Sequence, residues 1–175
     1  MQLADALELI DNQRIGTNGI QHWADLGCGT GLFTQALASL LPNESVIYAI
    51  DRQAQPRNTS PDGHSVRIDF IRADFEVELP TLPKLDGLLM ANALHYVADK
   101  KRFLERIVPR LSDRALVLIV EYETTRSNPW VPFPITYRQL GDLFSGIGFS
   151  TIQKLGERPS AYGQGNMYAA LLSRQ

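Results

Sequence analysis

The stretch that decides the fold of this 175-residue chain is Trp23-Ala-Asp-Leu-Gly-Cys-Gly-Thr-Gly-Leu-Phe33. Glycines stand at three alternate positions, directly after a strand-like run and directly before apolar residues that recur at helical spacing. A glycine-rich turn between a strand and a helix lets backbone amides approach a ligand that a Cβ would keep away. The stretch therefore predicts a ligand-binding turn, and glycines needed only for tight packing are the alternative.

The spacing of Gly27, Gly29 and Gly31 narrows the class of ligand. A dinucleotide site has its third glycine one residue later, where this chain has Leu32, and this disfavours an NAD-dependent oxidoreductase. A phosphate-binding P-loop ends in a lysine that this turn lacks. The turn also follows Asp25, and a carboxylate beside a pocket repels phosphate and suits a cationic group.

Residues 25–31, Asp-Leu-Gly-Cys-Gly-Thr-Gly, resemble the first motif of the class I S-adenosylmethionine-dependent methyltransferases. The resemblance implies that S-adenosyl-L-methionine is the cofactor and that Asp25 faces its ammonium group. It also implies that the turn borders the methionine part of the cofactor. On this interpretation the turn contributes the cofactor-binding residues Gly27, Cys28, Gly29 and Gly31.

Strand-like and helix-like patterns alternate along the chain. Strands are expected at 21–26, 45–50, 66–71 (near a sheet edge), 86–91 (central), 115–120, 149–155 and 167–172, and helices at 3–10, 33–41, after Asp99 to Leu111, and from Thr136 to 147. The alternation predicts an α/β fold with a parallel sheet, and the short connection between the last two strands predicts one antiparallel strand. The resemblance adds the strand order of a Rossmann-like, doubly wound, mostly parallel seven-stranded sheet. In that fold a C-terminal antiparallel hairpin closes the sheet and helices cover both faces.

Acidic residues follow the second and third expected strands. Asp51 ends the second strand, where a carboxylate can accept hydrogen bonds from both hydroxyls of a ribose; turn formation is the alternative. Arg52 either lies over the adenine or is solvated. The resemblance implies that Asp74 accepts a hydrogen bond from the adenine amino group and that Phe75 lines the base. The alternative for Asp74 is a cap or a turn.

The segment Met90-Ala-Asn-Ala-Leu-His-Tyr96 follows the fourth expected strand. It resembles the variant found in small-molecule methyltransferases rather than the Asn-Pro-Pro-aromatic motif of amino-group methylators. The resemblance implies that Asn92 borders the cofactor beside the reacting methyl. His95 is the candidate catalytic base, because its unperturbed pKa lies near neutrality; holding the loop by hydrogen bonds is the alternative.

Two other chemistries are disfavoured by the residues present. The only cysteine, Cys28, belongs to the glycine turn and is not expected to act as a nucleophile. The three histidines lack metal-ligand spacing, and Asp99 alone is a poor ligand set, so no metal is expected.

Composition bounds the class of protein. A net charge of −2 without a long basic run argues against nucleic-acid binding. A single cysteine, no basic leader and no membrane-spanning apolar run indicate a cytoplasmic protein that does not bind membranes. We expect one domain over residues 1–175, with a short helical segment at 1–20. This brief N-terminal extension leaves the pocket either open or completed by a second subunit of a homodimer.

Two loops with aromatic residues either form the wall of an acceptor pocket or cover the core. They are 122–134, with Arg126, Trp130 and Phe133, and 156–166, with Arg158 and Tyr162. The proline-containing stretch from Gln53 to Gly63 predicts a short or irregular crossover. Taken together, the glycine turn and the residues at the strand ends predict methyl transfer to an oxygen, nitrogen or carbon of a small molecule. Methylation of a protein or RNA, or a non-catalytic cofactor-binding subunit, are the alternatives.

Overall fold

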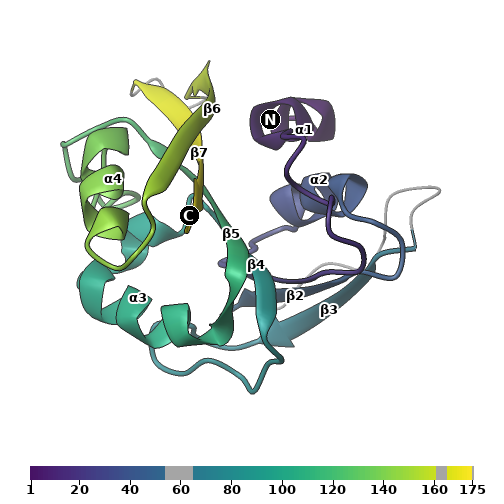
Figure 1. Cartoon of the computed structure of the whole chain (residues 1–175). Helices are drawn as coiled ribbons and strands as arrows, with labels where there is room; N and C mark the ends of the chain where they lie inside the picture. The colour runs from purple at the N-terminus through teal and green to yellow at the C-terminus, as the bar shows by residue number, and fades with distance from the viewer. Residues whose placement is uncertain (54–64, 161–164, 175) are drawn as a thin grey trace.

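A seven-stranded sheet forms the centre of the computed structural model, which describes residues 1–53, 65–160 and 165–174 (Figure 1). The strands are β1 (His22–Leu26), β2 (Val46–Asp51), β3 (Arg67–Arg72), β4 (Leu85–Ala91), β5 (Leu111–Tyr122), β6 (Thr151–Pro159) and β7 (Asn166–Ser173), in the order β3-β2-β1-β4-β5-β7-β6. Neighbouring strands from β3 to β5 are parallel, whereas β7 is antiparallel to both β5 and β6. The predicted α/β sheet with a C-terminal antiparallel hairpin is confirmed.

Helices cover both faces of the sheet, as predicted (Figure 1). One face carries α1 (Leu3–Ile10) and α2 (Leu32–Leu40), and the other carries α3 (Lys100–Ile107) and α4 (Tyr137–Ser145). The Asp99 side chain caps α3 by accepting the Arg102 N–H, and Thr136 and Gln139 form the expected capping box of α4. Within the described ranges, no helix is long and apolar enough to cross a membrane.

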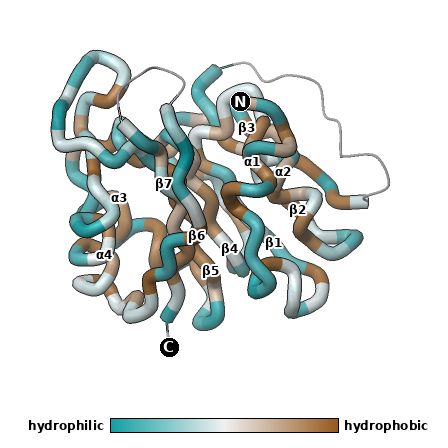
Figure 2. Tube along the Cα trace, turned by 90° about the horizontal axis from the view of Figure 1, so that it is seen from above, coloured by the Kyte–Doolittle hydropathy of each residue, from teal (hydrophilic) through white to brown (hydrophobic). Residues whose placement is uncertain are grey.

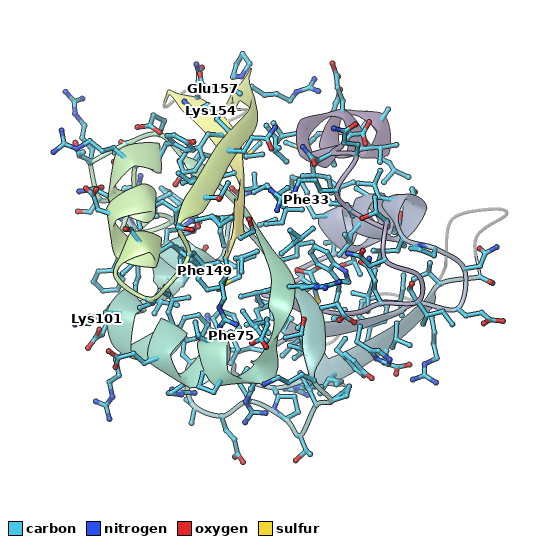
Figure 3. The ribbon with its side chains drawn as sticks, viewed as in Figure 1. Phe33, Phe75, Lys101, Phe149, Lys154 and Glu157 are labelled. Atoms are coloured by element: carbon cyan, nitrogen blue, oxygen red, sulfur yellow. The ribbon has the colours of Figure 1, made fainter. Side chains whose placement is uncertain are left out.

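The hydrophobic core consists of two layers, one on each side of the sheet. The layer beneath α1 and α2 contains Phe33, whose side chain lies between α2 and the strands (Figure 3). The layer beneath α3 and α4 contains Phe103 and Phe144. Hydrophobic residues, brown in Figure 2, gather on the strands and the inner helix turns. Because both layers share the sheet, burial fixes the sheet's position and therefore the position of its strand ends.

Most element boundaries differ from the sequence predictions by at most two residues, and the differences are larger at two places. Leu111 does not continue the helix of Phe103 and Ile107: α3 stops at Ile107, a 3-10 turn η2 (Val108–Arg110) containing Pro109 follows, and Leu111 begins β5 by pairing with Leu85. The prediction that a loop begins at residue 156 is also wrong, because β6 continues to Pro159. A register shift between Lys154 and Gly156 preserves the pairing with β7.

Arg158 therefore belongs to β6 rather than to a pocket loop. Its guanidinium binds the carboxylates of Asp5 and Glu8, which ties β6 to α1. Of the predicted crossover at 53–63, only Gln53 is among the described residues, and Tyr162 lies outside them.

Trp23 of β1 packs directly against Gly87 of the neighbouring strand β4. Trp23 is fully buried, and a Cβ at Gly87 would stand 2.2 Å from two carbons of its indole ring. Real Cβ atoms do not approach other heavy atoms so closely, so only glycine fits beside this indole.

We expect Gly87→Ala to lower the free energy of unfolding by about 1–3 kcal/mol or more, because the indole must shift within a packed core. Urea denaturation followed by circular dichroism measures this change. Gly141→Ala in α4 is the matched control: its Cβ would meet Ile152 at an ordinary 3.7 Å. That variant is expected to gain about 0.5–1 kcal/mol from helix propensity. Equal effects of the two substitutions would contradict the packing argument.

Candidate functional site

The carboxyl ends of β1 and β4 mark the point where the strand order reverses. In open α/β sheets this switch point forms a crevice that binds ligands. Asp25 lies in β1 next to its end, Asp51 ends β2, and Asn92 follows β4. The sheet thus brings polar residues that are distant in sequence to one edge.

The glycine turn between β1 and α2 is held against the end of β2. The N–H groups of Gly27 and Cys28 both donate to the Ile50 carbonyl, at 2.8 and 3.2 Å. All three glycines have positive φ values, 78° at Gly27, 52° at Gly29 and 83° at Gly31. A Cβ on Gly27 would lie 2.6 Å from the Ala93 Cβ. Left-handed backbone and close packing therefore both require glycine here.

Asp25 is a buried carboxylate with one unsatisfied oxygen. Its side chain is 1% exposed, and its Oδ2 accepts a 2.6 Å hydrogen bond from the Thr34 hydroxyl. Its Oδ1 has no hydrogen-bond partner among the described residues. Burial raises the pKa of Asp25 to about 7; the Thr34 hydrogen bond lowers it, and the negative charge of Asp51 raises it. The free oxygen is suited to a cationic or hydrogen-bond-donating group.

Asp51 connects the second strand to the glycine turn. Its Oδ2 accepts the Gly29 N–H at 2.9 Å, and its Oδ1 accepts the Gln53 N–H at 2.9 Å. A carboxylate has about four acceptor positions, so each oxygen keeps one for a ligand. Asp51 thus forms a turn and also offers acceptors to the crevice.

Asp74 and Arg52 face each other at the next strand end. The Arg52 Nη1 lies 3.8 Å from the Asp74 Oδ2, and Asp74 Oδ1 accepts the Glu76 N–H at 3.0 Å. Asp74 therefore forms the turn considered from the sequence. Arg52 pairs with this acid, an arrangement that was not predicted. Phe75 is buried and its ring packs edge-on against Phe103.

A cavity of about 580 Å³ opens over these strand ends. Nine of the predicted site residues line it: Asp25, Gly27, Cys28, Gly29, Asp51, Arg52, Asp74, Phe75 and Asn92. Gly31 and His95 are not part of its lining. The structure thus joins most of the predicted cofactor site in one cavity and puts the predicted base elsewhere.

His95 lies in a 3-10 turn, η1 (Leu94–Tyr96), directly after β4, and is 2% exposed. Its Nδ1 lies 2.8 Å from Oε2 of Glu121, and its backbone N–H donates to Glu121 Oε1 at 2.9 Å. Its Nε2 is buried without a hydrogen-bond partner among the described residues. The hydrogen-bonding role that the sequence left open is therefore present, and one ring nitrogen is still free.

A second cavity of about 510 Å³ adjoins the first and contains His95 in its wall. The two cavities share Asn92, Tyr96, Tyr122 and Ser160. Asn92 has a positive φ of 52°, and its Oδ1 is buried without a partner among the described residues. The two cavities therefore border one another at these residues.

The loop after β5 is attached to the His95 turn. The Phe133 N–H donates to the His95 carbonyl at 3.0 Å, and the Lys100 ammonium donates to the carbonyls of Phe133 and Val97 at 2.7 and 2.9 Å. Trp130 of the same loop lines the second cavity and is 76% exposed. Part of the aromatic loop therefore walls this cavity, one of the two alternatives from the sequence.

Sequence reasoning missed Thr34 and Glu121. Glu121 is the one acidic residue in the otherwise apolar end of β5, and that contrast was the available signal. Thr34 gave no signal, since a hydroxyl in a helical pattern is common. Each contacts the side chain of a predicted site residue, and such contacts depend on distances that the sequence does not contain.

Burial and the nearby charges of Asp25 and Asp51 raise the pKa of the Cys28 thiol, so it stays protonated and is a poor nucleophile. Within the ranges that the structure describes, no cluster of three or more His, Cys, Asp or Glu side chains is arranged to hold a metal.

Comparisons with known proteins identify the class to which this fold and site belong. The model of a family described as "Methyltransferase domain" matches residues 24–117, more than half of the chain. The chain belongs to this methyltransferase domain family. No curated protein matches the sequence significantly.

Solved methyltransferases share the fold. A 1,6-didemethyltoxoflavin-N1-methyltransferase from Burkholderia thailandensis, with 1,6-didemethyltoxoflavin and S-adenosylhomocysteine bound, superposes with a TM-score of 0.70 at 17% identity, over 99% of this chain and 78% of that one. A magnesium protoporphyrin IX methyltransferase from Synechocystis with S-adenosylmethionine bound has a TM-score of 0.64 at 12% identity, and the match covers 98% of this chain and 77% of that one. A methyltransferase of calicheamicin biosynthesis with S-adenosylhomocysteine bound has a TM-score of 0.67 at 21% identity, and the match covers 99% of this chain and 54% of that one. This likeness extends beyond the matched segment and includes the C-terminal hairpin.

The raised pKa of Asp25 predicts a pH-dependent effect of Asp25→Asn on stability. The pKa of Asp25 is about 7 in the folded protein and 3.8 ordinarily. The stability due to protonated Asp25 is therefore fully present below pH 3.8 and is lost as the pH rises through about 7. The asparagine of the variant cannot ionise and still accepts the Thr34 hydroxyl. We expect the variant's advantage in unfolding free energy to grow by roughly 2–3 kcal/mol from about pH 5 to about pH 8.

Urea denaturation of ligand-free protein at several pH values measures this difference. Asp113→Asn is the control, because the Asp113 side chain is fully exposed. A stability difference between Asp25→Asn and the unmodified protein that stays constant with pH would contradict the burial argument.

Proposed function

We propose that this chain binds S-adenosyl-L-methionine in the cavity over the glycine turn and transfers its methyl group to a small molecule in the adjoining cavity. The observation that carries the proposal is the wall shared by the two cavities, formed by Asn92, Tyr96, Tyr122 and Ser160. Methyl transfer is an in-line displacement, and holding two reactants in line supplies much of what a catalyst must provide. Two cavities that meet are suited to this task.

The residues of the first cavity fit the cofactor. The free Oδ1 of Asp25 supports binding of an ammonium group, and open space beside Gly29 supports close approach to its backbone. The remaining acceptor positions of Asp51 support a ribose role. When bound, the cofactor supplies an electrophilic methyl group on a sulfonium.

The same cavity has a second end at Asp74, Arg52 and Phe75. We assign these residues to the adenine: Asp74 as hydrogen-bond acceptor, and Arg52 and Phe75 as neighbours of the ring. Asn92 borders the methyl at the opposite end, where the cavities meet. This arrangement treats residues 1–175 as one domain, since α1 and the C-terminal strands contribute to the same core layer.

The second cavity supports a small acceptor, with His95 as the base. The acceptor atom forms its bond to the methyl carbon with a lone pair, and the carbon–sulfur bond breaks with its electrons left on sulfur. The acceptor's proton passes to Nε2 of His95, so the positive charge moves from sulfonium to imidazolium. The structural relatives named for methylation of 1,6-didemethyltoxoflavin and of magnesium protoporphyrin IX support this class of acceptor.

The proposal is tested by calorimetric titration of S-adenosylmethionine, followed by assay of S-adenosylhomocysteine release with a panel of hydroxyl- and amine-bearing small molecules. Binding in the micromolar range and release with at least one small molecule are expected. Absence of cofactor binding would overturn the proposal. Release only with protein or RNA acceptors would overturn the small-molecule assignment, and binding without release would indicate a non-catalytic subunit.

Asp51→Ala is expected to weaken cofactor binding at least about tenfold, because it removes the proposed ribose acceptors and the bond to the Gly29 amide. Calorimetry measures the affinity. Asp69→Ala, which removes an equal charge from neighbouring β3, should leave it unchanged. Unchanged affinity in Asp51→Ala would disprove the ribose assignment.

His95→Gln is expected to lower kcat by about 10²–10⁴-fold, the usual contribution of a general base, with cofactor affinity unchanged. Steady-state kinetics with any acceptor found in the panel measure kcat, and calorimetry measures the affinity. A loss of cofactor affinity that accounts for the whole rate effect would contradict the assignment of His95 as base.

A further inference from the structure

Glu121 and His95 form a buried pair, and His95 is one of the residues that line the second cavity. Glu121 is 1% exposed and His95 is 2% exposed. One carboxylate oxygen accepts the His95 backbone N–H, and the other lies 2.8 Å from Nδ1 of the ring and also accepts the Tyr122 N–H at 3.4 Å. Two contacts to one residue fix both the turn and the ring plane.

This pair determines which ring nitrogen carries the proton. The contact at 2.8 Å between Nδ1 and a carboxylate oxygen, which is a hydrogen-bond acceptor, favours the proton on Nδ1. In the neutral imidazole, Nε2 then has a bare lone pair. His95 is one of the residues that line the second cavity, and its Nε2 is buried without a partner among the described residues.

The groups around the pair favour a neutral ligand that donates a hydrogen bond. The rings of Tyr96 and Tyr122 pack on His95 at 4.4 and 5.9 Å between centroids, and the nearby Lys100 donates to two backbone carbonyls. Among the described lining residues of the second cavity there is no lysine or arginine to receive an anion. Asn92 Oδ1 at the shared wall is a second unpartnered acceptor.

We propose that Glu121 is a positioning residue that holds His95 as its Nδ1–H tautomer, so that the second cavity selects a neutral, planar acceptor whose O–H or N–H donates to Nε2. The inference rests on the proposed function and specifies its substrate class. Tyr96, Tyr122 and Trp130 in the wall supply flat surfaces for a planar ring. The same O–H or N–H group loses its proton to Nε2 as it is methylated.

Glu121→Gln tests the tautomer without removing side-chain volume. A glutamine has one acceptor oxygen, and we expect the His95 backbone N–H, at 2.9 Å, to take it in preference to the more distant Tyr122 N–H, at 3.4 Å. The amide NH₂ then faces Nδ1, so the ring proton must move to Nε2. Two-dimensional ¹H–¹⁵N spectra of ¹⁵N-histidine-labelled protein at mildly alkaline pH report the tautomer, and His95→Gln assigns the His95 signals.

We expect the Nδ1–H form in the unmodified protein and the Nε2–H form in Glu121→Gln. Glu123→Gln is the matched control, since Glu123 is two residues away and accepts the Tyr137 N–H instead; it should keep the Nδ1–H form. An imidazolium or an Nε2–H tautomer in the unmodified protein, or no change in Glu121→Gln, would overturn the positioning role.

The substrate class is tested by calorimetry on protein saturated with S-adenosylhomocysteine. The probes are 2-naphthol, 2-methoxynaphthalene, which lacks the donor, and 2-naphthoate, which is anionic. We expect 2-naphthol to bind about tenfold more tightly than either other probe, and Glu121→Gln to abolish this preference. Equal or tighter binding of 2-naphthoate, or no binding of 2-naphthol, would overturn the acceptor class.

These measurements involve no turnover. Failure of every acceptor to release S-adenosylhomocysteine would therefore overturn the proposed function while the tautomer and probe affinities stand. Conversely, activity on a carboxylated acceptor would retain the function and overturn the inference.

Discussion

The Ile50 carbonyl is the constraint on which the rest of the site depends. It accepts two successive amides of the glycine turn, which fixes the end of β1 against the end of β2. Asp51 follows directly and adds a third bond, to Gly29. Because three donors from one turn converge on two consecutive residues, the turn has little freedom, and Asp25 and Asp51 stand at a fixed separation across the crevice.

The site combines negative charge with unsatisfied acceptors. Asp25 and Asp51 are close enough that the charge of Asp51 raises the pKa of Asp25. Asp25 Oδ1, Asn92 Oδ1 and His95 Nε2 are buried without partners among the described residues. Such groups destabilise an empty fold, and a ligand that donates hydrogen bonds or carries positive charge compensates them. The same feature that lowers stability therefore defines what the cavities accept.

Much of the fold was predictable because strand and helix periods are local. The glycine turn and Asp51 were found together because their spacing is set by one helix and one strand. Leu111 was misassigned because its helical spacing continued past a turn at Pro109. The role of Glu121 could not be predicted, since its contact with His95 joins residues 26 apart through the adjacency of β4 and β5. Pairings between elements need the strand register, which a single sequence does not contain.

The hydrogen bonds between the loop after β5 and the His95 turn couple the lining of the second cavity to the position of His95. The Phe133 N–H donates to the His95 carbonyl, and the Lys100 ammonium donates to the Phe133 carbonyl. Exchange of this loop would therefore also disturb the turn that holds His95. Diversification of this scaffold is therefore expected to proceed by transplanting residues 93–135 as a single cassette, with β5 at its centre.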